Sequence, residues 1–338
     1  MAKWEELKRA AVNMLRVNMN FKAGEKAAFV TDVAAPEDWQ DVSFDLLAEM
    51  YERALMTKRV FEMVPEEFPG NQIDFITYRM TNQHGTEPPD WLAAKFLKYD
   101  VLVIMNTFSL SHTNAREMAC KAGIRVASMP GIEAEMFMPG GPMAADYERV
   151  AVETEKWAAQ ITAGNDVHIL TPFGTDLHFS INGRVGGVDA GLIHNRGDFG
   201  NLPGGEAYTA PVEGTAEGKL VVPSGWYPGL KKDMTLFFEN GLVTKVTGGG
   251  AVGEFFVQTF DFADESKKHR RNCAELGIGT NPNAKKIDNV LEAEKILGTI
   301  HVAVGDSSHL GGINESDLHE DFVLTQPTLI IDGHKLMG

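Results

Sequence analysis

The 338-residue chain has little cysteine and no long hydrophobic run, and both features narrow the classes of protein to which it can belong. Its two cysteines, Cys120 and Cys273, lie far apart, which argues against a disulfide scaffold and for a reducing compartment. The N-terminus lacks the apolar core of a signal peptide, and no apolar stretch approaches the ~20 residues that span a bilayer. We therefore predict a cytoplasmic protein with no membrane partner.

Positive charge is also scarce. The sequence has 31 basic against 47 acidic residues and a formal net charge of −16. Such a chain repels phosphate backbones, so we predict no nucleic-acid partner. With 43% hydrophobic and 23% charged residues it has the profile of a globular protein, and its length suffices for two domains.

The first 150 residues alternate strand and helix signals. Short apolar strands separated by helices predict a mostly parallel sheet covered on both faces. No GxGxxG or Walker motif opens any of the helices, so nucleotide binding is not supported. We predict a Rossmann-like α/β domain over residues 1–150. Its expected strands are Lys26–Thr31, Arg59–Val64, Asp100–Met105 and Ile124–Ser128, and its expected helices are 4–15, Trp39–Ala54 and one from Ser111 or Thr113 to Lys121.

Beyond a helix predicted over 143–163, strands and turns dominate. Thr175–Ile181 alternates apolar and polar residues, and two pairs of strands flank tight Asn-Gly and Asp-Gly turns, which predicts hairpins at Met234–Val246 and Thr328–Leu336. We predict an α+β domain over residues 151–338 that carries a metal site. The expected fold class is α/β, with this second domain following the Rossmann-like one.

Five residues of the second half are candidate metal ligands. Glu206 leaves a Gly-rich turn, Glu275 and His301 interrupt apolar strand-like runs, and His319 and Asp321 are two residues apart, so both face one side of a strand. Buried ionised carboxylates are costly unless they are paired or bound to metal.

Each candidate also has a structural interpretation. A histidine in an apolar strand is commonly a core residue, Glu206 could cap its turn, and His319 to Asp321 could begin an exposed strand. The combination of three carboxylates and two imidazoles suits zinc, cobalt, manganese or iron. Five ligands suit two ions about 3.5–4 Å apart that share a carboxylate.

The ligand-bearing segments resemble the thermophilic metallo-aminopeptidases of the aminopeptidase T group. The resemblance covers most of the chain, and the phrases that carry it are Asn201–Pro211, Ala274–Pro282, Gly298–Gly305 and 319–322. It implies that Glu206, Glu275, His301, His319 and Asp321 hold two divalent ions, zinc, cobalt or manganese. It also implies removal of N-terminal residues from peptides, and a homodimer; the exposed-looking aromatics of 226–227 and 255–256 favour a dimer as well.

The chain departs from that group in two ways. The aminopeptidases carry a tyrosine shortly after the histidine that matches His301, where this chain reads Gly305-Asp-Ser-Ser-His309, and this chain is shorter. A related branch of the fold contains non-heme iron dioxygenases that open hydroxylated pyridine rings. That branch has histidine in place of Glu275 and serine in place of Ala303, so Glu275 favours the peptidase.

The predicted function is therefore that of a metal-dependent aminopeptidase, a hydrolase acting on a peptide or other small-molecule substrate. The two ions would generate a hydroxide near neutral pH, and Glu206 is the candidate catalytic residue that carries the proton to the leaving amine. The alternatives are a single-iron, ring-cleaving dioxygenase of the hydroxypyridine type, and an inactive member of the fold that only binds or assembles.

Overall fold

The computed structural model describes the backbone of residues 2–338 and the side chains from Glu5 onward. The chain divides into two compact units. Unit 1 comprises the chain up to Tyr147 together with Gly191–Gly204, and unit 2 comprises Glu148–Ala190 and Gly205–Gly338. The prediction of one boundary near residue 150 did not include the return of 191–204 to the first unit. The fold class is confirmed: an α/β unit with a parallel sheet, and a second unit of mixed composition with antiparallel sheets.

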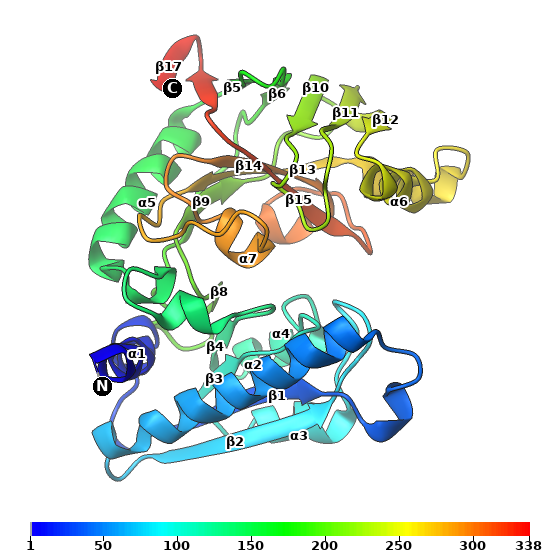
Figure 1. The fold of residues 1–338 in the computed structure, drawn as a ribbon. Coiled ribbons are helices and arrows are strands. Elements are labelled where there is room, and N and C mark those ends of the chain that lie inside the picture. The colour runs from blue at the N-terminus through cyan, green and yellow to red at the C-terminus, as the bar shows by residue number, and fades with distance from the viewer. Residues whose placement is uncertain (1) are drawn as a thin grey trace. The chain divides into compact units, whose positions relative to one another are not determined.

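Unit 1 is built on sheet A, a five-stranded sheet of order β2-β1-β3-β4-β8 in which every neighbouring pair is parallel. Helices cover both faces (Figure 1), as parallel strands require. The side chains of Leu92 and Phe96 pack with Val30 on one face, while Phe61 contacts Phe29 on the other. The strands are β1 (Lys26–Val33), β2 (Gln72–Arg79), β3 (Val101–Ile104), β4 (Arg125–Ser128) and β8 (Phe199–Asn201), and the α-helices are α1 (Ala2–Asn13), α2 (Phe44–Met63), α3 (Asp90–Phe96) and α4 (Asn114–Lys121).

One of the strand predictions for unit 1 was wrong, and one strand was not predicted. Arg59–Val64, expected as a strand, is the last part of α2 and the residue after it. Its buried residues continue the helical spacing of Met50, Arg53 and Thr57, so they belong to the same apolar stripe. The edge strand β2 was not predicted.

Unit 2 is a sandwich of two mainly antiparallel sheets. Sheet B has the order β12-β11-β10-β6-β5-β16-β17 and sheet C the order β15-β14-β13-β9-β7. One apolar core lies between them, with residues such as Leu177 and Leu236 from sheet B and Leu276 and Val302 from sheet C. The strands are β5 (Asp166–Leu170), β6 (Asp176–Ser180), β7 (Gly187–Asp189), β9 (Glu206–Thr209), β10 (Glu217–Val222), β11 (Met234–Glu239), β12 (Leu242–Gly248), β13 (Cys273–Gly279), β14 (Ile300–Gly305), β15 (His319–Leu324), β16 (Thr328–Ile331) and β17 (His334–Met337).

Three α-helices follow β4 along the chain (Figure 1): α5 (Tyr147–Ala163), α6 (Ala251–Phe260) and α7 (Val290–Ala293). Of the four aromatics that were read as exposed, Phe256 is fully buried and Phe255 is about half exposed. Trp226 and Tyr227 are half-buried against the core, and Tyr227 packs edge-on against Phe256. Among the described residues, no helix combines the length and apolar character needed to cross a membrane.

Candidate metal centre

The predicted ligands lie on one face of sheet C because side chains alternate along its strands. In β13 the core takes Leu276 and Ile278, so Glu275, Gly277 and Gly279 point the other way. The bulge between Cys273 and Glu275 places the Cys273 side chain in the core instead. Burial raises the pKa of that thiol to about 12, so it is an inert apolar residue here.

The pairing register brings the ligands together. Glu275 is paired with Ala303, which is paired with Asp321 on its other side, so these three residues form one row across β13, β14 and β15. His301 lies in the next row, beside Gly277. A Cβ at Gly277 would come within 1.8 Å of His301 Nε2, so only glycine leaves room for this ring. His319 is paired with Gly305, in the row on the other side of Asp321. Three strands and three rows thus deliver four donor groups to one place.

The donor atoms are close enough to share an ion. His319 Nε2 lies 3.1 Å from Glu275 Oε2 and 3.8 Å from Asp321 Oδ1, and His301 Nε2 lies 3.4 Å from Glu275 Oε1. One donor atom each of Glu275, His301 and Asp321 fall within 4.8 Å of one another. Glu275 and His301 are buried, whereas His319 and Asp321 are half-buried at the open side of the cluster.

The orientation of His319 is fixed from behind. Its Nδ1 lies 2.7 Å from the carbonyl oxygen of Asp306 and donates to it, which assigns the proton to Nδ1 and turns Nε2 toward the carboxylates. A backbone carbonyl in this position is a common outer partner of metal-binding histidines. The ring of His309 packs edge-on against His319, with the ring centroids 5.0 Å apart.

Glu275 is paired with imidazoles and not with arginine. An ion pair with Arg270 or Arg271, which precede Glu275 by a few residues, would be another explanation for this buried carboxylate. Arg270 instead binds Asp317 through two nitrogens, and Arg271 lies 3.7 Å from Glu265. The position of Glu275 is therefore explained by His301 and His319.

The electrostatics show an excess of negative charge. Burial opposes the charge of Glu275, but hydrogen bonds from His301 and His319 outweigh it and hold its pKa well below the usual range. Burial also acts to lower the pKa of both histidines, yet the surrounding carboxylates raise that of His301 to about 9 and that of His319 to about 10. Both rings are thus drawn toward the protonated state in the metal-free cluster, which therefore favours added positive charge.

Two residues of the cluster had not been singled out from the sequence. Lys295 is fully buried, with Nζ 2.5 Å from Glu206 Oε1 and 3.0 Å from Glu294 Oε1. Lys295 and Glu294 directly follow the short helix α7, and no periodic pattern or spacing in the sequence indicates that they are site residues. Glu206, the predicted catalytic residue, thus has an ammonium partner; burial raises the pKa of Glu206 to about 8, against the opposite effect of Lys295.

The donor set fits a divalent metal. Asp321 Oδ1 is buried without a hydrogen-bond partner among the described residues, although it lies beside protonatable imidazoles. A bound cation would satisfy this oxygen and neutralise Glu275, and the mixed imidazole and carboxylate set is typical of first-row transition metals.

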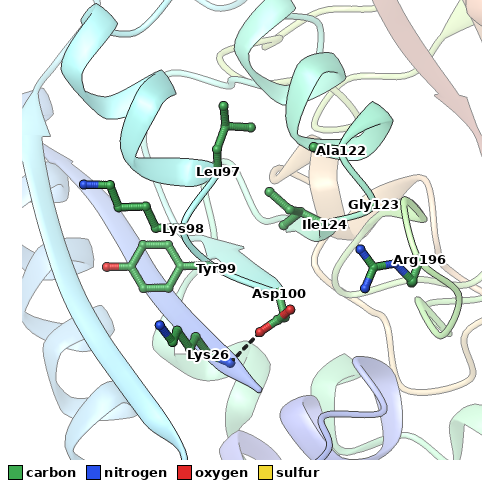
Figure 2. Close-up of a pocket in the computed structure, with 9 residues that line it drawn as sticks. All are labelled: Lys26, Leu97, Lys98, Tyr99, Asp100, Ala122, Gly123, Ile124 and Arg196. Atoms are coloured by element: carbon green, nitrogen blue, oxygen red, sulfur yellow. Dashed lines mark hydrogen bonds between the residues drawn. The ribbon is translucent and has the colours of Figure 1, made fainter. Parts of the chain in front are cut away.

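Two other features lie apart from this cluster. On the outer face of sheet B, His168, Asp176 and His178 also bring donor atoms within 4.8 Å of one another, but Asp176 and His178 are exposed. In unit 1 a cavity of about 320 Å³ lies at the amino-terminal ends of β1, β3 and β4 (Figure 2), where the Lys26 amide donates to Asp100. Ligands of parallel sheets bind at the opposite, carboxyl ends, and the cavity contains none of the predicted ligands.

Comparison with known proteins identifies the family of the chain. The sequence profile of the 2,5-dihydroxypyridine 5,6-dioxygenase family matches residues 16–338. A 2,5-dihydroxypyridine 5,6-dioxygenase of Pseudomonas putida KT2440 is 23% identical over 248 residues, which are 68% of this chain and 67% of the relative. The solved 2,5-dihydroxypyridine dioxygenase structure from Pseudomonas putida KT2440 matches with a TM-score of 0.71 at 17% identity, covering 98% of this chain and 95% of that one. Wild-type AmpT from Thermus thermophilus matches with a TM-score of 0.62 at 18% identity, covering 98% and 97%.

The prediction of an aminopeptidase was wrong. The likeness to AmpT confirms a shared fold, but the family profile and the curated relative both describe an oxidoreductase, not a hydrolase. The words hydrolase, protease and aminopeptidase therefore do not apply, and the role of Glu206 as a proton carrier in peptide hydrolysis falls with them. What had been the alternative fits the comparisons better: this chain belongs to the 2,5-dihydroxypyridine 5,6-dioxygenase family.

Proposed function

We propose that the chain is a metal-dependent dioxygenase that opens the ring of a small hydroxylated aromatic compound, with 2,5-dihydroxypyridine as the first substrate to test. Membership of the family supports the reaction class. The name of the Pseudomonas putida relative supports the substrate class and the position of cleavage. At 23% identity the substrate of this chain is a proposal of its own.

The observation that carries the proposal is the donor set on sheet C. Two imidazoles, His301 and His319, face two carboxylates, Glu275 and Asp321, across three paired strands. Two histidines and one carboxylate around an ion with open positions are typical of non-heme iron oxygenases. We therefore propose ferrous iron in place of the zinc, cobalt or manganese expected of a peptidase.

Glu275 gives this chain a particular character. The dioxygenase branch of the fold has histidine at the position that corresponds to Glu275. A carboxylate in place of a neutral imidazole gives the proposed centre one more negative charge. That charge offsets more of the positive charge of the ion, which favours a substrate that binds with little negative charge of its own. Ala303, between Glu275 and Asp321 in the same row, contributes no donor atom of its own.

The overall reaction is balanced without a further reductant. One carbon–carbon bond of the ring breaks, each of its carbons gains one oxygen atom, and both atoms of O₂ end in the product. When bound, a ferrous ion would supply the electron transfer that ground-state O₂ needs to react with the ring. The chain's own residues hold the geometry: the Asp306 carbonyl fixes the tautomer of His319, and Gly277 leaves room for His301.

Oxygen uptake tests the proposal. Protein stripped by chelation and reloaded anaerobically with Fe²⁺ should consume O₂ on addition of 2,5-dihydroxypyridine, as the ring absorbance disappears. With ¹⁸O₂, mass spectrometry should find both labelled atoms in the product. Asp321→Asn should abolish uptake, and His178→Ala on sheet B should not change it.

The opposite result is equally clear. Protein carrying one iron per chain that consumes no O₂ with any dihydroxypyridine, trihydroxypyridine or catechol would refute the proposed reaction class. Uptake with catechols but with no pyridine would keep the class and refute the substrate.

A further inference from the structure

The cluster on sheet C contains two possible metal sites that share one histidine. Glu275, His301 and Asp321 form the first trio, and Glu206, Glu294 and His301 form the second, with the donor atoms of each trio within 4.8 Å of one another. In a two-metal centre the carboxylates of both trios would bind ions about 3.5–4 Å apart. His301 Nε2, which faces both Glu206 and Glu275, would be a ligand of only one of these ions. The two trios differ in the groups that lie beside their carboxylates.

The second trio already has a cation. Lys295 is fully buried, and its Nζ lies 2.5 Å from Glu206 Oε1 and 3.0 Å from Glu294 Oε1. An ammonium at these distances contacts one oxygen of each carboxylate, Oε1, and supplies the positive charge that a second ion would otherwise bring. The other oxygen of Glu206, Oε2, faces His301 Nε2 at 3.3 Å. A divalent ion entering there would lie within a few ångströms of a buried positive charge, where screening by water is weak.

The backbone holds this lysine in place. The amide of Lys295 donates to the carbonyl oxygen of Glu292 at 3.1 Å, and its carbonyl oxygen accepts from the amide of Asn281 at 2.8 Å. The residues before and after Lys295 are also held in place. Ile296 forms an isolated β-bridge with Asn281, and the carboxylate of Glu294 contacts the Lys295 ammonium. Fixed at both its N–H and its C=O, the residue projects its side chain into the carboxylates, and a solvent-exposed rotamer would leave Glu206 buried without a cation.

We propose that Lys295 is a built-in cation that takes the place of a second metal ion, so that the chain binds a single ion at Glu275, His301, His319 and Asp321. Glu206 is then a partner of Lys295 rather than a metal ligand. This concerns the number of ions and does not depend on which reaction the site performs. Removing the charge of Lys295 should open the second trio to metal.

Metal counting tests the proposal. Isothermal titration of chelated protein with Zn²⁺, followed by elemental analysis after gel filtration, should give one tightly bound ion per chain in the wild type. Lys295→Met keeps the length of the side chain and removes its charge, and should give two. All proteins in this comparison should carry His178→Ala, because the exposed trio of His168, Asp176 and His178 could bind Zn²⁺ and add to the count.

Two further measurements keep the result interpretable. Lys232→Met removes an exposed lysine and should still give one ion. With Mn²⁺, electron paramagnetic resonance should show isolated ions in the wild type and a spin-coupled pair in Lys295→Met, which a second ion bound elsewhere would not produce.

Glu206→Gln decides the case if Lys295→Met fails to fold. As a partner of Lys295, Glu206 should tolerate the change with one ion still bound and its dissociation constant within about threefold of the wild-type value. Two tight ions in the wild type, a folded Lys295→Met that still binds one, or loss of the tight ion in Glu206→Gln would each overturn the proposal. Failure of the ring-cleavage assay would leave all of these counts unaffected.

Discussion

At the scale of single residues, the backbone around the metal centre holds the rings of His301 and His319 in place. Gly277 has an ordinary backbone conformation, so its role lies in the space it leaves, which the His301 ring fills. His319 is fixed differently, by a backbone carbonyl that selects one of its two tautomers. In both cases the position of the ligand ring is determined by the main chain, and not by a contact with another side chain.

Gly277→Ala should displace His301 and weaken metal binding. The added methyl would lie 1.8 Å from His301 Nε2, a clash that a packed sheet relieves only by moving the ring or the strand. We expect a loss of about 1–3 kcal/mol in stability, as for other overpacked positions, together with a loss of metal measured by titration. Gly183→Ala is the control, because Gly183 has a positive φ but open space around it. Its cost should be confined to stability, and unchanged metal binding in Gly277→Ala would contradict the assignment of His301.

Glu275→Gln should remove the charge that the two imidazoles share. Metal affinity should fall by at least the ~10-fold to 100-fold that loss of an outer partner costs, because Glu275 is proposed as a direct ligand. Glu320→Gln is a matched control on the same sheet: Glu320 points to the opposite face of β15 and accepts a hydrogen bond from Tyr227 at 2.8 Å. Titration calorimetry should find metal affinity unchanged in Glu320→Gln, and equal effects of the two substitutions would count against Glu275 as a ligand.

At the scale of elements, the segment that leads into β15 is held by charged pairs. Asp317 accepts from Arg270 Nε at 2.7 Å and lies 3.2 Å from His269 Nε2, both from the 3-10 helix at Glu265–Arg271. Two residues later the chain presents His319. The position of this ligand therefore depends partly on the ion pair of Asp317.

This pair gives a pH dependence with a defined sign. The hydrogen bonds from Arg270 lower the pKa of Asp317 from 3.8 to about 2 in the folded chain. The carboxylate thus stabilises the fold above pH 3.8, and the contribution is lost as the pH falls toward 2. Because Asp317 is largely exposed, we expect only ~0.2–1 kcal/mol. The difference in unfolding free energy between wild type and Asp317→Asn, from urea denaturation, should be constant from pH 7 to 5 and shrink below pH 4. A difference that is as large at pH 2.5 as at pH 7 would refute the assignment.

Elements with a strong local pattern could be predicted from the sequence, and others could not. The hairpins at β11–β12 and β16–β17 carry tight turn signals and are confirmed. Residues 59–64 were read as a strand because a six-residue segment with four apolar residues is too short to distinguish the two periods. Only the preceding turns of α2 show the helical period. The edge strand β2 was missed although its polar residues alternate with Ile73, Phe75 and Tyr78, a pattern typical of a half-buried strand.

The same reasoning applies to the site. His319 and Asp321 share a strand face by spacing alone, so their proximity was predictable. Lys295 was not, because its contacts with Glu206 span strands and a short helix far apart in sequence. Ion pairs between segments that are distant in the sequence produce no periodic pattern in it. The choice of a hydrolase over an oxygenase failed for a related reason, since one set of donor residues serves both chemistries.

For the whole molecule, the metal should stabilise one unit and not the other. All the proposed ligands belong to unit 2. An ion present at 100 times its dissociation constant adds about 2.7 kcal/mol to the stability of the state it binds, which corresponds to about 5–10 °C in the melting temperature of a unit of this size. Calorimetry with and without chelator should show the shift in the transition of unit 2. Unchanged melting of both units after complete chelation, with no metal found, would contradict a metal centre.

The homodimer stays a prediction. It came from the resemblance and from aromatics that were read as exposed, of which Phe255 is about half exposed while Phe256 is buried. Light scattering at micromolar concentration should give twice the 37.0 kDa mass of the chain. A monomeric mass would refute it, and Phe255→Ser, which replaces the more exposed of the two phenylalanines, would show whether this side chain contributes to any dimer.

The strand β8 has a consequence for how the protein is made. It completes sheet A beside β4, yet it is synthesised after α5 and three strands of the other unit. On the ribosome, β4 must therefore wait with an open edge until residue 201 emerges, and an open strand edge invites pairing with other chains. A fragment that ends at residue 150 would keep that edge permanently. Joining residue 147 to residue 191 through a short linker and ending at residue 204 would restore the fifth strand, and that shorter chain is the better starting point for studying the first unit alone.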